Sequence, residues 1–326
     1  MNTEELGSTL HQIFSQPTRS TVLHLQGPPG VGKTAIVSQA AAKCKKPLTT
    51  IALPTCEAVD LRGMPTIVAG RTVWASPLPR EGEGVLLLDE LSSAPPDVQV
   101  AAHHVVWSES GSDMNLPAGW HVVLTGNRAS DRTLYRAPSA PLRNRMTVVT
   151  IEPDIGHWAQ WAMTKGVSSA VVGFLRWRPE LLAAKEIPTD GAFVSPRSWE
   201  RVSSLLPLSV SANAERELIS GTVGEAAATE FSAYLRTVRE LPSIRAILDD
   251  PQKADVPSSP SLLYALTTAL ASHTRVSQES AMEYCCRIPA EFALLYIRDV
   301  RDHFNLRTDP HFPKWVSKHK TLFRED

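Results

Sequence analysis

Gly27-Pro28-Pro29-Gly30-Val31-Gly32-Lys33-Thr34 has the spacing of a phosphate-binding loop: a glycine, four residues, and then Gly-Lys-Thr. Glycines let the backbone curve around phosphate oxygens and direct successive N–H groups at them. In this pattern Lys33 supplies a positive charge to the β- and γ-phosphates, and the Thr34 hydroxyl is a ligand for Mg²⁺. The stretch therefore predicts a site for a nucleoside triphosphate, with these eight residues as its phosphate-binding loop.

The neighbouring sequence supports this interpretation over a chance glycine-rich turn. Residues 21–26 are mainly apolar and are typical of a buried strand that enters the loop. Residues 34–43 predict the helix that leaves the loop, with its N-terminus facing the phosphates. Strand, loop and helix together form the structural context that this motif requires.

Short apolar runs recur between residues 21 and 151. They cover 21–26, 48–53, 85–88, 121–125 and 147–151. Their hydrophobicity is continuous rather than alternating, which is typical of strands buried on both faces of a parallel sheet. We therefore predict an α/β fold with a five-stranded parallel sheet around the phosphate-binding loop.

The third apolar run ends in Asp89 and Glu90, which is a Walker B pattern. At the carboxyl end of its strand, Asp89 is expected to hold Mg²⁺, and Glu90 to orient and polarise the water that attacks the γ-phosphate. The alternative is an acidic strand end without a catalytic role. The position of the pair downstream of a phosphate-binding loop favours the catalytic interpretation.

Four polar residues further along the chain are also candidates for the site. Asn127 follows the fourth run and can bind the same water or the γ-phosphate, although Gly126-Asn127 is also a common start of a turn. Arg143 and Arg145 precede the fifth run, where they are either ligands of the γ-phosphate or solvated surface residues. Arg197 follows Pro196 in the first turn of a predicted helix, where a cation interacts unfavourably with the helix dipole. Such a local conflict is expected where a residue binds a ligand.

The order of these motifs resembles that of an AAA+ ATPase. Within that superfamily the chain is similar to the MoxR-like and dynein-related branch, because Asp60-Leu61-Arg62-Gly63 resembles its Asp-Leu-x-Gly and residues 89–99 resemble its Asp-Glu-x-x-x-Ala-x-x-x-x-Gln helix. The sequences of 126–151 and 174–202 look closest to bacterial and phage ATPases of this type. The resemblance covers residues 1 to 205 and is weaker after that.

The resemblance implies a role for each matching residue. Asn127 corresponds to sensor 1, and Arg197 to sensor 2, which reaches the γ-phosphate from the lid of the same subunit. Arg145 corresponds to the arginine finger, which reaches into the site of the next subunit. It stands in an Asn-Arg-Met that replaces the family's usual Asp-Arg-Phe, and Arg143 is a second candidate for the finger. The family hydrolyses ATP to ADP and phosphate with Mg²⁺, and a finger delivered to a neighbour implies a homo-oligomeric ring, typically a hexamer.

Three regions are expected on this basis. Residues 1–151 are the AAA+ nucleotide-binding α/β core, 152–240 a helical lid that carries sensor 2, and 241–326 a helical C-terminal extension of the lid. In the lid, apolar residues at helical spacing predict one long helix over 215–241. The sequence departs from the family between Val105 and Trp120. The hairpin expected there, at 106–113, is short and has few charges, which argues against a pore-threading role.

Composition limits the remaining possibilities. Lys and Arg number 33 against 34 Asp and Glu, with a net charge of −1, so no overall field attracts the chain to nucleic acid or a membrane. No apolar run has the length of a spanning helix, and the acidic N-terminus lacks a signal-peptide pattern, so we expect a cytoplasmic protein of a bacterium, or of the host if phage-encoded. None of the four cysteines has zinc-site spacing, and we interpret them as reduced thiols.

Three functions follow from these expectations. The first is an AAA+ remodeller whose ring pulls on or activates a partner protein, which in this branch is often a protein with a von Willebrand factor A-type domain. The second is an ATP-dependent nucleic-acid motor or loader, against which the balanced charge and the absence of a zinc or helix-turn-helix module argue. The third is a nucleotide-gated scaffold with little turnover, which the presence of Lys33, Asp89 and Glu90 disfavours.

Overall fold

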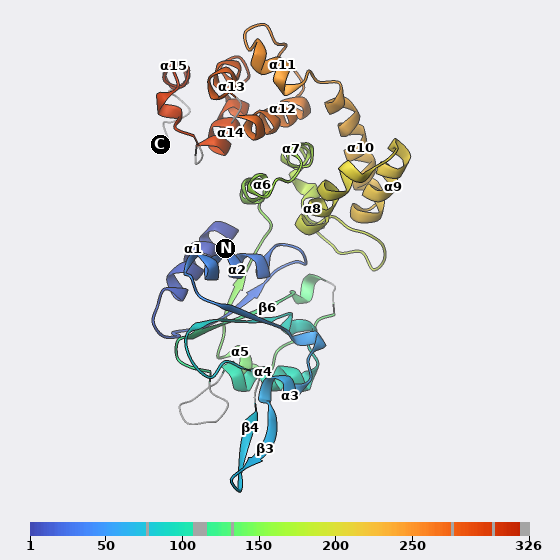
Figure 1. The fold of residues 1–326 in the computed structure, drawn as a ribbon. Coiled ribbons are helices and arrows are strands. Elements are labelled where there is room, and N and C mark those ends of the chain that lie inside the picture. Colours follow the sequence, from blue (N-terminus) through green and yellow to red (C-terminus); the bar gives the residue numbers. More distant parts are fainter. Residues whose placement is uncertain (76–77, 107–115, 132–133, 275–276, 302–303, 320–326) are drawn as a thin grey trace. The chain divides into compact units, whose positions relative to one another are not determined.

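The computed structural model describes residues 1–75, 78–106, 116–131, 134–274, 277–301 and 304–319 of the 326-residue chain. The chain divides into two units (Figure 1). The α/β unit contains Met1–Asp154 and Lys185–Thr189, and the helical unit contains Ile155–Ala184 and Asp190–Asp326.

Five parallel strands form the sheet of the α/β unit, in the order β2-β5-β6-β1-β7. Their bounds are β1 Val22–Gln26, β2 Leu48–Ala52, β5 Gly84–Asp89, β6 Trp120–Gly126 and β7 Thr147–Thr150. The inner strands β5 and β6 are almost wholly buried, whereas the edge strands β2 and β7 are half-buried or exposed. The five predicted strands and the α/β fold are thus confirmed.

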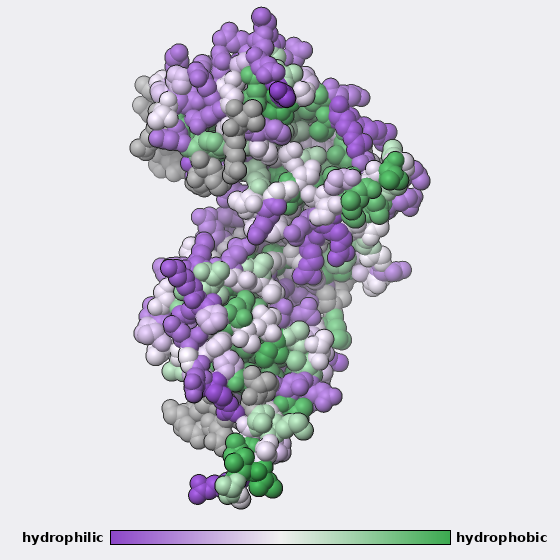
Figure 2. Space-filling view, in the orientation of Figure 1, coloured by the Kyte–Doolittle hydropathy of each residue, from purple (hydrophilic) through white to green (hydrophobic). Residues whose placement is uncertain are grey.

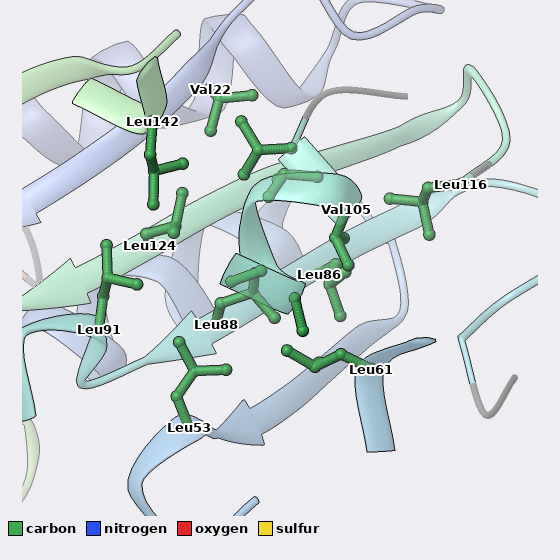
Figure 3. Close-up of a cluster of buried hydrophobic side chains, with 14 of the residues drawn as sticks. Val22, Leu53, Leu61, Leu86, Leu88, Leu91, Val105, Leu116, Leu124 and Leu142 are labelled. Carbon is green, nitrogen blue, oxygen red and sulfur yellow. The ribbon is translucent and has the colours of Figure 1, made fainter. Parts of the chain in front are cut away.

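Helices cover both faces of this sheet because successive strand residues point to opposite sides. The helices of the unit are α1 Thr3–Phe14, α2 Lys33–Lys43, α3 Ala58–Arg62, α4 Pro96–Val106 and α5 Ala140–Arg143, with short 3₁₀ turns η1 Leu53–Thr55, η2 Leu91–Ser93 and η3 Ala129–Asp131. On one face, α1 and α2 pack with Leu23 and Leu25 of β1. On the other face, α3, α4 and α5 pack with alternate residues of β5 and β6 such as Leu86 and Leu124 (Figure 3).

A two-stranded antiparallel hairpin, which was not among the predicted strands, follows α3. Its strands are β3 Met64–Val68 and β4 Arg71–Ala75, joined by Ala69 and Gly70 with φ of 50° and 76°. Two positive φ angles in a two-residue loop give the twist that hairpin strands need. Figure 1 shows the hairpin projecting from the α/β unit.

The second unit is helical, as expected for the C-terminal portion. Its helices are α6 Ile155–Thr164, α7 Ser169–Trp177, α8 Pro196–Leu205, α9 Ala212–Val223, α10 Glu225–Arg239, α11 Ile244–Asp249, α12 Pro260–His273, α13 Gln278–Cys285, α14 Ala290–Val300 and α15 Phe312–Lys318, with 3₁₀ turns η4 Pro179–Leu181, η5 Leu206–Leu208 and η6 Leu306–Thr308. One apolar cluster joins residues of α6 to α10 with Ala265 of α12, and a second joins residues of α11 to α15. The division at residue 240 stays a prediction.

The prediction of one long helix over 215–241 is wrong. The segment forms α9 and α10, which are separated at Gly224. Gly224 has a φ of 89°, and a Cβ at this position would lie 2.9 Å from the carbonyl oxygen of Ala192. The backbone thus leaves the helical region where only glycine fits, so the helix ends there and a new one begins.

An ion pair buried inside the helical unit links two of its helices. Arg176 of α7 donates from both terminal nitrogens to the carboxylate of Asp299 of α14, at 2.6 and 2.7 Å. Their side chains are 4% and 0% exposed. Arg176 also donates to Thr268 Oγ1 of α12 at 3.0 Å, so one guanidinium connects three helices.

No helix in the described ranges combines the length and the apolar character required to cross a membrane.

Candidate functional site

The candidate site lies at the carboxyl edge of the sheet, where β1, β5 and β6 end side by side. In the parallel register Gln26 of β1 pairs with Gly126 of β6, and the next residue, Gly27, donates its N–H to the Gly126 carbonyl at 3.3 Å. The phosphate-binding loop therefore begins directly beside the end of β6. Ligand sites of open α/β sheets lie at this edge.

Each glycine of the phosphate-binding loop, Gly27–Thr34, is required at its position for a different structural reason. A Cβ at Gly27 would lie 2.7 Å from the Ile151 carbonyl oxygen, so a larger residue would displace the loop from the sheet. Gly30 and Gly32 adopt φ of 76° and 96°, which favour glycine. Gly32 is the N-cap of α2 and provides no side-chain cap, so the helix presents its N-terminal amides and dipole to an anion.

Lys33 lies across this loop. Its Nζ donates to the carbonyl oxygens of Gly27 and Pro28 at 2.8 and 3.1 Å, and to Asn127 Oδ1 at 3.2 Å. The structure thus brings together the predicted lysine and the predicted sensor residue, which are 94 positions apart. Phosphate oxygens would compete for the same ammonium group more strongly than neutral carbonyls do, because their bonds to it are charge-assisted.

Thr34 and Asp89 form the second part of the site. Thr34 Oγ1 donates to the two carboxylate oxygens of Asp89, at 3.2 and 3.1 Å. A hydroxyl and a carboxylate oxygen at this separation match the hard oxygen ligands that Mg²⁺ takes, with its remaining positions filled by water and phosphate. The described residues contain no group of three or more His, Cys, Asp or Glu side chains that would hold a metal by themselves.

Glu90 is exposed and directly follows the strand that ends in Asp89. It has a φ of 61°, in the left-handed region that residues with a Cβ rarely adopt. Its backbone N–H donates to Thr125 Oγ1 at 3.0 Å, so β6 holds the turn that carries Glu90. Backbone strain of this kind is concentrated at functional sites.

Hydroxyl groups near these residues were not predicted as part of the site. Thr125 Oγ1 donates to Asp89 Oδ1, and Ser92 Oγ accepts the N–H of Asn127 at 2.8 Å. Both side chains are fully buried. The signal available in the sequence was position: Thr125 directly precedes Gly126-Asn127, and Ser92 lies two residues after Glu90.

Gln99, the glutamine of the motif over residues 89–99, connects two backbone segments beside the site. It is buried in α4 and donates Nε2 to the carbonyl oxygens of Leu91 and Arg136, at 3.0 and 3.3 Å. It therefore ties the loop that precedes α5 to the turn that follows the Walker B strand.

His24 lies on β1 beneath the phosphate-binding loop. Its side chain is 1% exposed, and neither ring nitrogen has a hydrogen-bond partner among the residues that the structure describes. Burial, and secondarily the charge of Lys33, lowers the pKa of His24 to about 4. The imidazole is therefore neutral at physiological pH.

The two finger candidates have different surroundings at the end of α5. The Arg143 side chain is exposed and makes no hydrogen bond or ion pair with the described residues. Arg145 is half-buried, and its guanidinium donates to the Pro141 carbonyl oxygen at 3.0 Å. Its charge also contributes, after burial, to the lowered pKa of His103.

Arg197 belongs to the helical unit, not to the α/β unit. It is exposed in the first turn of α8, behind the N-cap Ser195, whose hydroxyl accepts the N–H of Ser198 at 3.1 Å. The hairpin expected at 106–113 lies outside the described residues except for Val106, which ends α4.

Comparisons with known proteins give a family for part of the chain. Residues 22–146 match the AAA domain of the dynein-related subfamily. In an alignment over 84 residues that covers 24% of this chain, the sequence is 42% identical to Protein NorQ of Paracoccus denitrificans (strain Pd 1222). The aligned part covers 31% of NorQ, so the chain spans about a third of the length of that relative.

Solved structures give weaker matches. NtrX from Brucella abortus in complex with ADP superposes with a TM-score of 0.38 and 15% identity, covering 98% of this chain and 68% of that one. A RuvB variant from Thermotoga maritima superposes with a TM-score of 0.39 and 14% identity, covering 83% and 84%. At these scores the superpositions add nothing to the family match.

Proposed function

Residues 22–146 form an AAA+ ATPase domain of the dynein-related subfamily, and from that premise we propose that the chain hydrolyses ATP at the subunit interfaces of a homo-oligomeric ring and thereby remodels or activates a partner protein. The observation that carries the proposal is the convergence of Lys33, Thr34, Asp89 and Asn127 at the end of three adjacent strands. These residues are far apart in the sequence, and each has a side chain suited to phosphate or Mg²⁺.

Each residue has a defined part in the proposal. The phosphate-binding loop and Lys33 bind the triphosphate, and Thr34 and Asp89 hold Mg²⁺, which when bound would neutralise phosphate charge. Glu90, exposed at the end of β5, orients and polarises the attacking water. Asn127 and Arg197 act as sensors of the γ-phosphate, Asn127 from the same sheet edge and Arg197 from the lid.

The proposed ring is supported by an exposed arginine at the end of α5, the short helix that precedes β7. Arg143 presents its guanidinium to solvent, as a finger for a neighbouring subunit requires, and Arg145, which the family resemblance assigns as the finger, is the alternative. A hexamer is proposed from family resemblance. We place the activity in the cytoplasm, where ATP is available.

A protein partner is supported by the hairpin of β3 and β4. Met64, Ile67 and Val68 are 65%, 79% and 55% exposed, and Figure 2 shows apolar side chains gathered on the hairpin. Exposed apolar clusters of this kind mark surfaces that bind other proteins. The hairpin has one basic residue, Arg71, and the whole chain has a net charge of −1, so a DNA-binding surface is disfavoured. A von Willebrand factor A-type domain as the partner is proposed on family resemblance.

The test is the steady-state ATPase rate together with ATP affinity for the wild type, Lys33→Ala and Glu90→Gln. Lys33→Ala should lose nucleotide binding, whereas Glu90→Gln should keep it and lose turnover by about 10²-fold or more. Glu81→Gln, an exposed glutamate before β5, is the matched control and should behave as the wild type. Specific activity should rise with protein concentration, because the site needs two subunits.

Wild-type turnover in Glu90→Gln would refute the assignment of the water-activating residue. A specific activity that is constant down to concentrations at which the protein is monomeric would refute hydrolysis at a subunit interface.

A further inference from the structure

The turns that follow β5 and β6 are joined by two hydrogen bonds of reciprocal form. Thr125, on β6, accepts the backbone N–H of Glu90, which follows β5, at 3.0 Å. Ser92, two residues beyond Glu90, accepts the backbone N–H of Asn127, which follows β6, at 2.8 Å. Each strand end thus supplies a hydroxyl to the amide of the functional residue on the other.

We infer that Thr125 and Ser92 form a hydroxyl clamp, in which these two side chains act as positioning residues that hold Glu90 and Asn127 in one fixed arrangement for hydrolysis. The inference rests on the proposed function of Glu90 and Asn127. Neither hydroxyl needs to touch nucleotide, since each acts through the backbone of the residue that does.

The conformation of Glu90 gives the clamp a specific task. With a φ of 61°, Glu90 occupies a backbone region that a residue with a Cβ rarely adopts, so contacts outside the residue must maintain it. The hydrogen bond from its N–H to Thr125 is such a contact. Without it the turn can relax toward a common conformation, and the carboxylate of Glu90 would point elsewhere.

Thr125 also connects Glu90 to the adjacent part of the site. The same Oγ1 that accepts from Glu90 donates its proton to Asp89 Oδ1, which in turn accepts from Thr34. A hydroxyl can accept and donate at once, whereas valine, which has the same shape, can do neither. The chemistry of the side chain, and not its volume, is therefore what the clamp requires.

Close packing also surrounds the backbone that links Thr125 to Asn127. A Cβ at Gly126, the residue between Thr125 and Asn127, would lie 2.9 Å from His24 Nε2 and 3.1 Å from Ser92 Oγ. Ser92 is fully buried and His24 is 1% exposed. The chain therefore reaches Asn127 through a glycine that lets Ser92 approach the amide of Asn127 closely.

The experiment measures kcat for ATP hydrolysis and, separately, the Kd of a fluorescent ATP analogue. Thr125→Val and Ser92→Ala should each lower kcat by about 10- to 100-fold, the size expected when a reacting group is displaced by about 1 Å. The Kd should change less than about threefold, because the residues of the phosphate-binding loop are unaltered. Thr125→Ser, which keeps the hydroxyl, should restore most of kcat.

Two controls separate positioning from general stability. Thr49→Val makes the same change on β2, where the Thr49 side chain has no hydrogen bond among the described residues, and should leave kcat unchanged. Thermal unfolding of each variant should show a folded protein at the assay temperature. The double variant should lose less activity than the product of the two single losses, since the two hydroxyls hold one arrangement.

The outcomes distinguish the clamp from the function that it serves. Wild-type kcat in Thr125→Val and Ser92→Ala beside an inactive Glu90→Gln overturns the clamp alone. A Thr125→Ser variant as slow as Thr125→Val, or a loss of ATP affinity equal to the loss of kcat, also overturns it. Full turnover in Glu90→Gln overturns the proposed role of Glu90 and the inference with it.

Discussion

Lowering the pH should destabilise the α/β unit through His24, the buried imidazole on β1. The unfolded chain titrates this group near pH 6.5, whereas burial and, to a smaller extent, Lys33 lower its pKa to about 4 in the folded protein. Between these values the unfolded chain binds the proton more readily. The contribution of neutral His24 to stability is thus fully present above pH 6.5 and is lost as the pH falls toward 4.

The size of the effect follows from this difference in pKa. Each pKa unit corresponds to about 1.4 kcal/mol, so the stability lost across the interval is about 3 kcal/mol. Replacing His24 with leucine removes the titrating group and leaves an apolar side chain in a buried site. The variant should therefore keep the stability that the wild type loses on acidification.

The assay is amide hydrogen exchange of β1 and β6, corrected for the intrinsic exchange rate at each pH, because His24 lies on β1 and its register partner Leu124 lies on β6. His103 and His121 also have lowered pKa values, mainly through burial. They remain in both proteins, so the difference between the wild type and His24→Leu isolates His24. His104→Gln, on the exposed side of α4, is the control and should follow the wild type. A parallel loss of stability in the wild type and His24→Leu would refute the reasoning.

Two further predictions concern the finger and the helical unit. Arg143→Ala alone should lower kcat by about 10³-fold. Mixing it with Lys33→Ala should restore part of the activity, since mixed rings contain interfaces with one intact finger and one intact phosphate-binding loop. A larger loss of kcat in Arg145→Ala than in Arg143→Ala would assign the finger to Arg145 instead. Asp299→Asn should destabilise the helical unit by about 3–5 kcal/mol in urea unfolding, because Arg176 loses its buried counter-charge. Arg176→Met with Asp299→Leu should recover most of that loss, and a double variant as unstable as Asp299→Asn would count against this explanation.

The α/β fold could be predicted because its signals are local. Each strand is a continuous apolar run, and a strand buried on both faces needs such a run. The hairpin of β3 and β4 was missed because its side chains are exposed on both faces, so it lacks the hydrophobic pattern of a core strand. The break between α9 and α10 was missed because the apolar residues keep a helical spacing across Gly224, whose φ depends on packing against Ala192.

The candidate site divides in the same way. Gly27–Thr34, Asp89, Glu90 and Asn127 could be identified from the sequence, because each belongs to a motif or directly follows a strand. The surroundings of Arg143 and Arg145 could not, because only the folded chain leaves Arg143 exposed while Arg145 is half-buried and reaches the Pro141 carbonyl oxygen.

The sequence by itself determined the phosphate-binding loop, the acidic end of β5 and the five strands of the parallel sheet, because spacing and hydrophobicity are properties of neighbouring residues. Tertiary structure alone decided that Lys33 reaches Asn127 and that Thr125 and Ser92 accept the backbone N–H groups of Glu90 and Asn127. Parallel pairing of β1, β5 and β6 sets these contacts. Hydrogen bonds depend on positions to within tenths of an ångström, and strands that are distant in the sequence acquire such positions only when the sheet forms.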